Sequence, residues 1–164
     1  MKLYHGTFTP DIKQPDLSKC RQKTDFGKGF YTTKSFEQAS KWAILRKNRL
    51  RAEKAYIVEY EIDDATLSSE EYKIKHFNGA THEWLEFVFN NRKGTVTEMY
   101  DMVMGPVAND SLYATLLLYE QGVLSVDATI TQLKTYTLFD QLSFHTSKAI
   151  KTLRFVKTIN VTDE

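Results

Sequence analysis

The strongest constraint on the fold is the segment 55–62 (AYIVEYEI), in which apolar and polar residues alternate and strand-forming residues predominate. Alternation with a period of two is typical of a β-strand. We predict further strands at 2–5, 30–33, 72–77, 100–104, 135–138, 141–145 and 155–161, and helices at 36–53, 82–91, 111–120, 126–134 and 147–153. Because helices and short strands are mixed irregularly, the sequence predicts an α+β fold rather than repeated βαβ units.

Several boundaries of these elements can be predicted from single residues. Ser35 and Thr81 are suited to cap the first two helices, and Gly94 follows the second. We expect the strand at 100–104 to break at Gly105-Pro106. The residues of the first helix that we expect to face the core are Phe36, Ala39, Ala43 and Leu50.

Composition narrows the class of protein. The chain has 164 residues, 41% of them hydrophobic and 26% charged, which fits one soluble domain over residues 1–164. Its one cysteine, Cys20, excludes an intrachain disulfide and a cysteine-rich metal site, and we expect no metal. Since the sequence has neither a membrane-spanning apolar stretch nor a secretory signal at its start, we expect a cytoplasmic protein without membrane contact.

Two short segments combine a polar ring with glycine and threonine. One is Leu3–Thr7 (LYHGT) and the other is Gly27–Thr33 (GKGFYTT). Glycine lets another backbone or a ligand approach closely, and a histidine nitrogen can bond a ligand hydroxyl. Taken singly, these polar rings are more often structural than ligand-binding, so the hypothesis of a site depends on their occurring together.

This pair of motifs, with the aromatic Trp42 eleven positions after Tyr31, resembles the NAD-binding half of the ADP-ribosyltransferase superfamily of the His-Tyr-Glu type. The diphtheria-toxin branch is similar in this respect. Including the motifs 105–110 (GPVAND) and 141–146 (QLSFHT), nearly the whole chain resembles DUF3990, a bacterial family of uncharacterised domains placed in that superfamily. The resemblance implies a split β-sandwich core with flanking helices.

The same resemblance implies a function. NAD would be the substrate, and ADP-ribose would be transferred to a protein or nucleic-acid acceptor. Such an enzyme could be a bacterial toxin or defence effector with an antitoxin or immunity protein as partner. The alternatives are an NAD glycohydrolase, or a catalytically weak or inactive module that binds NAD, another nucleotide or RNA.

Roles for individual residues follow from the resemblance. His5 would bond the adenosine-side ribose, the Gly6 backbone would hold the nicotinamide amide, and Thr7 would help to fix His5. Tyr31, with Thr32 beside it, would stack on one face of the nicotinamide ring. Trp42 would stack on the other face, where the superfamily more usually has tyrosine.

The catalytic position departs from the superfamily pattern. Gln141 stands where a glutamate is usual, at the head of a late strand. Glutamine can bond a ribose hydroxyl, but it cannot supply the negative charge that stabilises an oxocarbenium-like state. Asp110 is our candidate for the missing acid, with Asn109 beside it, although Asp110 could equally be a helix cap. We interpret His145 as structural.

The first predicted helix is basic. Its cationic residues are Lys41, Arg46, Lys47, Arg49, Arg51 and Lys54. Such faces are usually only solvated, and the net charge of +1 provides no general attraction to nucleic acid. If this helix does contact nucleic acid, an RNA or DNA acceptor for ADP-ribose would follow.

Overall fold

In the computed structural model, residues 1–96, 98–107, 110–136 and 139–161 are described, without the side chains of residues 110–112. Seven strands belong to this part of the chain: β1 (Lys2–Thr7), β2 (Phe30–Thr33), β3 (Ala55–Glu61), β4 (Ile74–His76), β5 (Met102–Val107), β6 (Phe139–Phe144) and β7 (Arg154–Val161). The helices are α1 (Phe36–Leu50), α2 (His82–Lys93), α3 (Asp110–Glu120), α4 (Val126–Leu133) and α5 (Ser147–Ile150), with 3-10 turns η1 (Leu17–Lys19) and η2 (Asp64–Ser68). The prediction of an α+β fold is confirmed.

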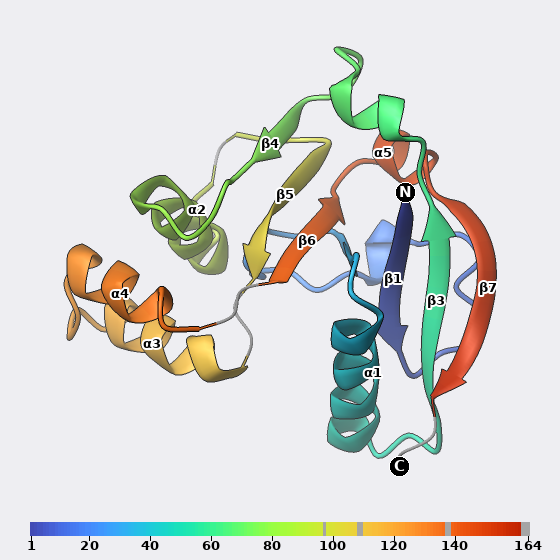
Figure 1. Cartoon of the computed structure of the whole chain (residues 1–164), viewed down its shortest axis with the longest axis horizontal. Helices are drawn as coiled ribbons and strands as arrows, with labels where there is room; N and C mark the ends of the chain where they lie inside the picture. The colour runs from blue at the N-terminus through green and yellow to red at the C-terminus, as the bar shows by residue number, and fades with distance from the viewer. Residues whose placement is uncertain (97, 108–109, 137–138, 162–164) are drawn as a thin grey trace.

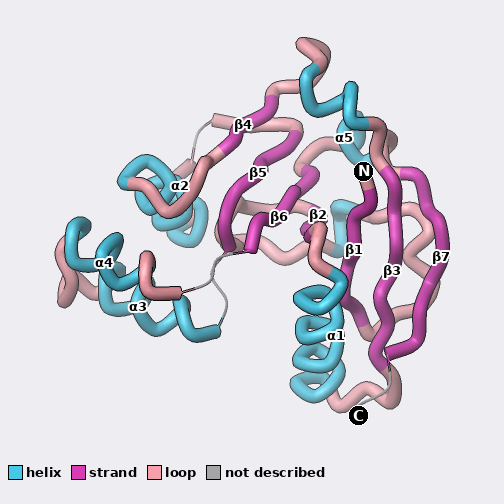
Figure 2. The backbone as a smooth tube through the Cα atoms, in the orientation of Figure 1, coloured by secondary structure: helices cyan, strands magenta, loops and turns pink. Residues whose placement is uncertain are grey.

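The strands form one mixed sheet in the order β4-β5-β6-β2-β1-β3-β7, shown in Figure 1 and, as a backbone tube, in Figure 2. Only β4 and β5 run parallel; every other neighbouring pair is antiparallel. The centre of the sheet is weakly joined. β1 pairs with β3 over its whole length, but its register with β2 consists of Tyr4 opposite Thr33.

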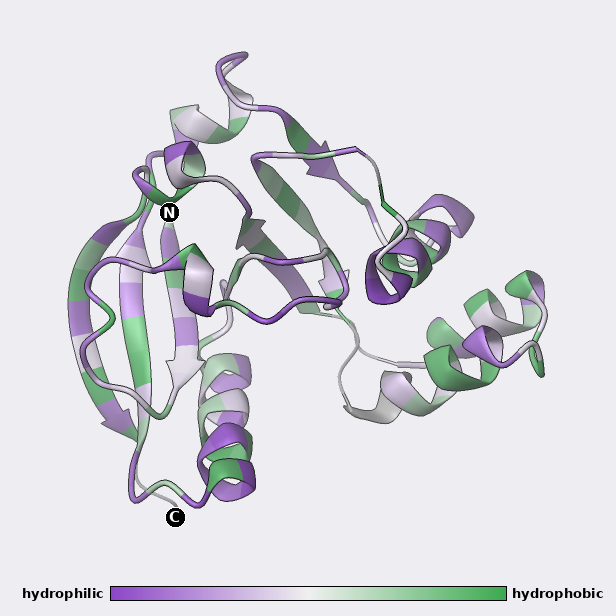
Figure 3. Ribbon diagram, turned by 180° about the vertical axis from the view of Figure 1, so that it is seen from behind, coloured by the Kyte–Doolittle hydropathy of each residue, from purple (hydrophilic) through white to green (hydrophobic). Residues whose placement is uncertain are grey.

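Each face of the sheet buries its own apolar cluster. Leu3, Phe30 and Phe144 belong to a cluster that the segment 8–29 covers through Ile12, Leu17 and Cys20. Figure 3 shows this segment crossing that face. A second cluster lies under α2, where Trp84 and Leu85 are fully buried, and extends to α3 and α4. Because β2 alternates, its consecutive residues Phe30 and Tyr31 contribute to different clusters.

Helix α1 packs closely against β1 and β3 (Figure 1). A Cβ atom on Gly6 would lie 2.2 Å from the Ala39 carbonyl oxygen and 2.8 Å from the Ala43 nitrogen. The two alanines are fully buried at this contact. Small residues on both sides therefore set the distance between helix and sheet.

Several details of the sequence prediction were wrong, including the ends of the predicted helices 36–53 and 147–153, which stop at Leu50 and Ile150. Phe36 and Leu50 are 44% and 59% exposed, so the buried stripe of α1 is narrower than expected. The strand β5 continues through Gly105-Pro106, because the short β4 leaves this end of the strand without a partner on one side. Residues 135 and 136 form a turn and a bend instead of a strand, and the rest of that predicted strand, 137–138, lies outside the described residues.

The predicted helix caps are confirmed. The hydroxyls of Ser35 and Thr81 accept hydrogen bonds from the backbone of Gln38 and Trp84. Gly94 ends α2 with φ of 77°, in the left-handed region that glycine adopts without strain.

Candidate functional site

His5 lies where the sheet is most weakly joined. Beyond Tyr4, the rest of β1 pairs with β3 but no longer with β2. The His5 imidazole fills part of this gap, and its Nδ1 lies 2.7 Å from the backbone oxygen of Tyr31. A side chain thus replaces the next ladder hydrogen bond between β1 and β2.

The two nitrogens of His5 have different hydrogen-bonding roles. A carbonyl oxygen can only accept, so Nδ1 must carry the proton and donate. Burial, assisted by the nearby charge of Arg46, lowers the pKa of His5 to about 4, and the ring is neutral at pH 7. The remaining nitrogen, Nε2, is therefore an unprotonated acceptor, and among the described residues it has no hydrogen-bond partner.

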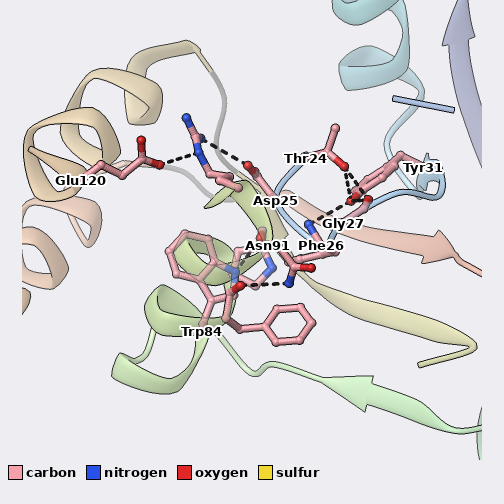
Figure 4. A network of polar contacts seen from close by, with 11 residues as sticks. Thr24, Asp25, Phe26, Gly27, Tyr31, Trp84, Asn91 and Glu120 are labelled. Carbon is pink, nitrogen blue, oxygen red and sulfur yellow. Dashed lines mark hydrogen bonds and ion pairs between the residues drawn. The ribbon is translucent and has the colours of Figure 1, made fainter. Parts of the chain in front are cut away.

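Tyr31 is fixed by its hydroxyl to the turn that precedes its strand (Figure 4). The hydroxyl donates to the Gly27 carbonyl at 2.7 Å, accepts from the Phe26 N–H at 2.9 Å, and lies 2.8 Å from the Thr24 hydroxyl. Burial raises the pKa of Tyr31 far above its usual value. Tyr31 is therefore a neutral, rigidly held ring and is unsuited to act as a phenolate base.

The rings of His5 and Tyr31 lie on opposite sides of β2. His5 stacks on Phe30, with 4.3 Å between ring centroids and 29° between ring planes. Tyr31 points the other way, stacking towards Phe26 at 6.2 Å. The structure therefore joins His5 to the Tyr31 backbone, not to its ring.

Trp42 borders the same apolar cluster as Tyr31. No direct ring contact joins Trp42 to Tyr31 or His5 within the described part of the chain. A nicotinamide held between Tyr31 and Trp42 thus remains a prediction, with both rings on the α2-facing side of β2.

The remaining residues of the two motifs make local contacts. The hydroxyl of Thr7 accepts a hydrogen bond from the Thr9 N–H at 3.1 Å, so it caps a turn instead of contacting His5. The hydroxyl of Thr32 is buried and donates to the Leu142 carbonyl at 2.7 Å. Both hydroxyls are engaged within the protein.

Gln141 is the expected site residue with an unmet bonding requirement. It pairs with Thr33 of β2 and with Gly105 of β5, is 4% exposed, and its Oε1 has no hydrogen-bond partner in the described chain. A buried acceptor without a donor costs about 1–3 kcal/mol. Strand alternation places this carboxamide on the same side of the sheet as Tyr31.

The proposed acid is not located by the structure. Asp110 is the first residue of α3, but its side chain lies outside the described residues, as does Asn109 altogether. Their roles stay predictions.

His145, which the sequence analysis interpreted as structural, forms a pair with Ser143 beside Tyr31. The Ser143 hydroxyl lies 2.7 Å from Nε2 of His145, whose Nδ1 lies 2.8 Å from the Lys28 carbonyl. By the same reasoning as for His5, Nδ1 donates to that carbonyl and Nε2 accepts from serine. Burial lowers the pKa of His145, and its ring meets that of Tyr31 edge-on at 6.2 Å.

This pair supports the turn that carries Tyr31. A Cβ on Gly29 would lie 2.6 Å from Nδ1 of His145, so glycine is required for the imidazole to reach the turn. The sequence signal was the glycine of the motif 27–33, whose partner could not be inferred without the fold.

A surface depression of about 620 Å³ lies elsewhere, lined by residues 14–18 and by Ser147, Ile150 and Lys151. None of the expected site residues lines it. The geometry around His5 and Gln141 is therefore the better guide to chemistry.

The family model of a protein of unknown function, DUF3990, matches residues 1–155. The chain belongs to the DUF3990 family. The match spans both motifs, Trp42, β6 and the 105–110 segment, so all the expected site residues lie within it. No curated protein matches this DUF3990 chain significantly.

The described part of this DUF3990 domain has neither a membrane-spanning helix nor a cluster of metal-ligating side chains. None of its helices combines the length and the apolar character needed to cross a bilayer. Across residues 1–96, 98–107, 110–136 and 139–161, no three His, Cys, Asp or Glu residues are placed to hold a metal ion together.

Proposed function

We propose that this DUF3990 domain binds NAD at the gap between β1 and β2 and transfers its ADP-ribose to a macromolecular acceptor. The observation that carries the proposal is the fixed protonation state of His5. A neutral imidazole anchored through Nδ1 offers Nε2 as an acceptor for a ribose hydroxyl. This agrees with the role that the His-Gly-Thr motif implies.

The proposed reaction breaks the bond between the nicotinamide nitrogen and C1′ of the adjoining ribose. The bonding electrons leave with nicotinamide, which becomes neutral, and the sugar acquires oxocarbenium character. A nucleophilic oxygen or nitrogen of the acceptor forms the new bond to C1′ and loses its proton. If water is the nucleophile, the same steps give NAD hydrolysis.

Three side chains, those of Tyr31, Trp42 and Gln141, would support this reaction from the Tyr31 side of the sheet. Tyr31 would provide a flat, immobile surface for the nicotinamide, with Trp42 on the other face of that ring. Gln141 would accept a hydrogen bond from a ribose hydroxyl through its unpartnered Oε1. All three would orient the substrate, which lowers the entropic part of the barrier.

A second candidate function follows from Gln141 itself. A carboxamide provides no negative charge opposite the sugar, and that electrostatic contribution is commonly worth several kcal/mol in enzymes. On this reading, the domain binds NAD, a related nucleotide or RNA and turns NAD over slowly or not at all. The Asp110→Asn variant distinguishes the two functions. If Asp110 is the compensating acid of an enzyme, the variant should lose NAD turnover; a binding module has no turnover to lose.

A role as a toxin or defence effector belongs to the same proposal. It would require an acceptor that matters to the cell and an antitoxin or immunity protein that covers the NAD site. A cytoplasmic location would be consistent with this role.

The test is nicotinamide release from NAD, followed by chromatography, with cell lysate as the source of acceptors. His5→Asn is the sharpest variant, because its amide N–H can replace Nδ1 as donor to Tyr31 while the acceptor Nε2 is lost. We expect at least tenfold slower release, and unchanged release for His76→Asn at an exposed histidine. If the folded wild-type protein binds NAD but releases no nicotinamide, the enzyme is refuted and the binding module is supported. If it does not bind NAD, both proposed functions are refuted.

A further inference from the structure

The most informative side chain outside the motifs is Arg46. It lies on α1 in the same stripe as Ala39 and Ala43, which press against Gly6, so its side chain extends along the end of β1. Its Nη1 lies 3.4 Å from the Gly6 carbonyl oxygen, and its guanidinium lies 5.8 Å from the centroid of the Phe8 ring. Arg46 thus reaches the C-terminal end of β1, at the residue that follows His5.

The charge of Arg46 is not neutralised within the described protein. No carboxylate there lies within ion-pair distance, and the charged side chain that most opposes its protonation is a second cation, Arg21. Burial and Arg21 both lower the pKa of Arg46, although arginine stays protonated at any physiological pH. Of the five N–H donors of the guanidinium, one is used, in a long bond to Gly6.

A second arginine in the same chain shows the alternative. Arg92 is 11% exposed and is matched by two carboxylates, with its Nε 2.6 Å from Glu120 and its Nη1 3.4 Å from Asp25 (Figure 4). Arg92 is thus a structural arginine whose charge is balanced by neighbouring carboxylates. A partly buried arginine that faces another cation instead is suited to an anionic ligand.

The position of this charge matches the chemistry of a nucleotide. Arg46 is close enough to His5 to lower the pKa of its imidazole, and its guanidinium contacts the residue that follows His5. In a nucleotide, phosphate and ribose hydroxyl groups are close neighbours. A ribose bonded to His5 would bring its phosphate towards Arg46.

We propose that Arg46, assisted by Arg21, forms an anion site at the C-terminal end of β1 that holds the diphosphate of a dinucleotide. The identity of the ligand rests on the proposed function; the anion site itself rests on the unpaired guanidinium. Guanidinium forks bind phosphate oxygens in pairs, so the site would fix the orientation of the diphosphate as well as its charge.

The test compares ligands with and without the diphosphate by calorimetry. ADP-ribose carries the diphosphate and has no nicotinamide to release, whereas adenosine lacks phosphate. We expect Arg46→Gln to weaken ADP-ribose binding about tenfold to a hundredfold and to leave adenosine binding unchanged. Lys41→Gln on the same helix, which removes an exposed cation paired with Glu37, should change neither.

The dependence of ADP-ribose affinity on salt concentration is a second test of the anion site. Affinity of the wild type for ADP-ribose should fall as ionic strength rises, and Arg46→Gln should reduce that slope. If Arg46→Gln does not fold, the exposed Arg21→Gln variant replaces it, with an expected loss of about threefold to tenfold. Equal ADP-ribose affinity in Arg46→Gln, or in its replacement, and in Lys41→Gln would overturn the anion site.

The two proposals can fail separately. If NAD and ADP-ribose do not bind the wild type, the proposed function fails, and inorganic pyrophosphate then decides the anion site. A rise in melting temperature with pyrophosphate in the wild type but not in Arg46→Gln supports the site with another ligand. No rise in either protein overturns it.

Discussion

At the scale of single residues, two polar groups, one partly buried and one buried, each carry an acceptor without a partner among the described residues. The His5 ring uses Nδ1 to tie β1 to β2 and leaves Nε2 as an acceptor. The Gln141 carboxamide leaves Oε1 without a donor. Both are acceptors, which suits a ligand rich in hydroxyl and amide donors.

The depressed pKa of His5 makes stability depend on pH in a defined direction. With a pKa of about 4 when folded and 6.5 when unfolded, His5 favours the folded state fully above pH 6.5. This contribution is lost as the pH falls towards 4, because the unfolded chain takes up the proton first. The expected loss is up to about 3 kcal/mol, since one pKa unit corresponds to about 1.4 kcal/mol.

Urea unfolding of wild type and His5→Asn across this pH range measures that loss. The difference between their free energies of unfolding should shrink as the pH falls, while other groups affect both proteins equally. A difference that stays constant would show that His5 is protonated in the folded protein or equally solvated in both states.

Gln141→Leu should separate ligand binding from stability. It removes an unpartnered acceptor, so the free energy of unfolding should stay unchanged or rise by up to about 1 kcal/mol, while NAD affinity falls about tenfold. Gln38→Leu is the matched control, because Gln38 is as deeply buried but accepts from the Thr33 hydroxyl at 2.9 Å. It should lose about 1–3 kcal/mol of stability. Destabilisation of Gln141→Leu to the same degree would show that Gln141 has a structural partner.

At the scale of elements, the contact between β1 and α1 aligns the site. Gly6 allows α1 to lie directly on the strand, and this places Arg46 at the end of β1. The helix therefore positions a charge as well as covering the sheet.

Gly6→Ala should destabilise the protein by about 3 kcal/mol or more, because the new methyl group would meet backbone atoms of α1 that cannot rotate away. Gly122→Ala provides the contrast, with φ of 73° and open space around it, and should cost only about 1 kcal/mol of backbone strain. Thermal unfolding of both variants measures whether Gly6→Ala loses more stability than Gly122→Ala. Equal losses would mean that α1 shifts easily on β1.

The sequence predicted elements better than it predicted contacts. The alternation at 55–62 and the caps Ser35 and Thr81 depend on neighbours within a few residues, and these were found. The exposure of Phe36 and the passage of β5 through Pro106 depend on which elements lie alongside, so local patterns could not reveal them.

The features of the candidate site also fall into those that local sequence predicted and those that depend on tertiary packing. The motifs placed His5, Tyr31 and Gln141 on three strands, and register shows that β2 lies between the other two. The opposite directions of the His5 and Tyr31 rings, the His145 support of the Gly29 turn and the unpaired Arg46 all depend on tertiary packing.

At the scale of the whole molecule, the Tyr31 turn is linked to the helices on the other side of the second cluster. Arg92 of α2 joins Asp25, next to the turn, to Glu120 of α3 (Figure 4). Its guanidinium also lies 4.5 Å from the Tyr113 ring centroid. The position of Tyr31 and the packing of α3 are therefore coupled through one side chain.

Arg92→Ala should cost about 3–5 kcal/mol, because it removes the cation that pairs with the two largely buried carboxylates of Asp25 and Glu120. Hydrogen exchange should become faster in residues 24–27 and in α3 together. Lys41→Ala, which breaks the exposed pair with Glu37, should change stability by less than about 1 kcal/mol and leave exchange in both segments unchanged. Faster exchange confined to α3 would contradict the coupling.

Whether His5 is a neutral acceptor for NAD is measured by the nitrogen spectrum of the histidine rings, recorded with and without saturating NAD at pH 7. We expect free His5 to be neutral with the proton on Nδ1, and NAD to shift the Nε2 signal of His5 to that of a hydrogen-bonded acceptor. The exposed rings of His76 and His82 should not change. A charged His5 in the free protein, or a His5 spectrum unaffected by NAD, would contradict this role of His5.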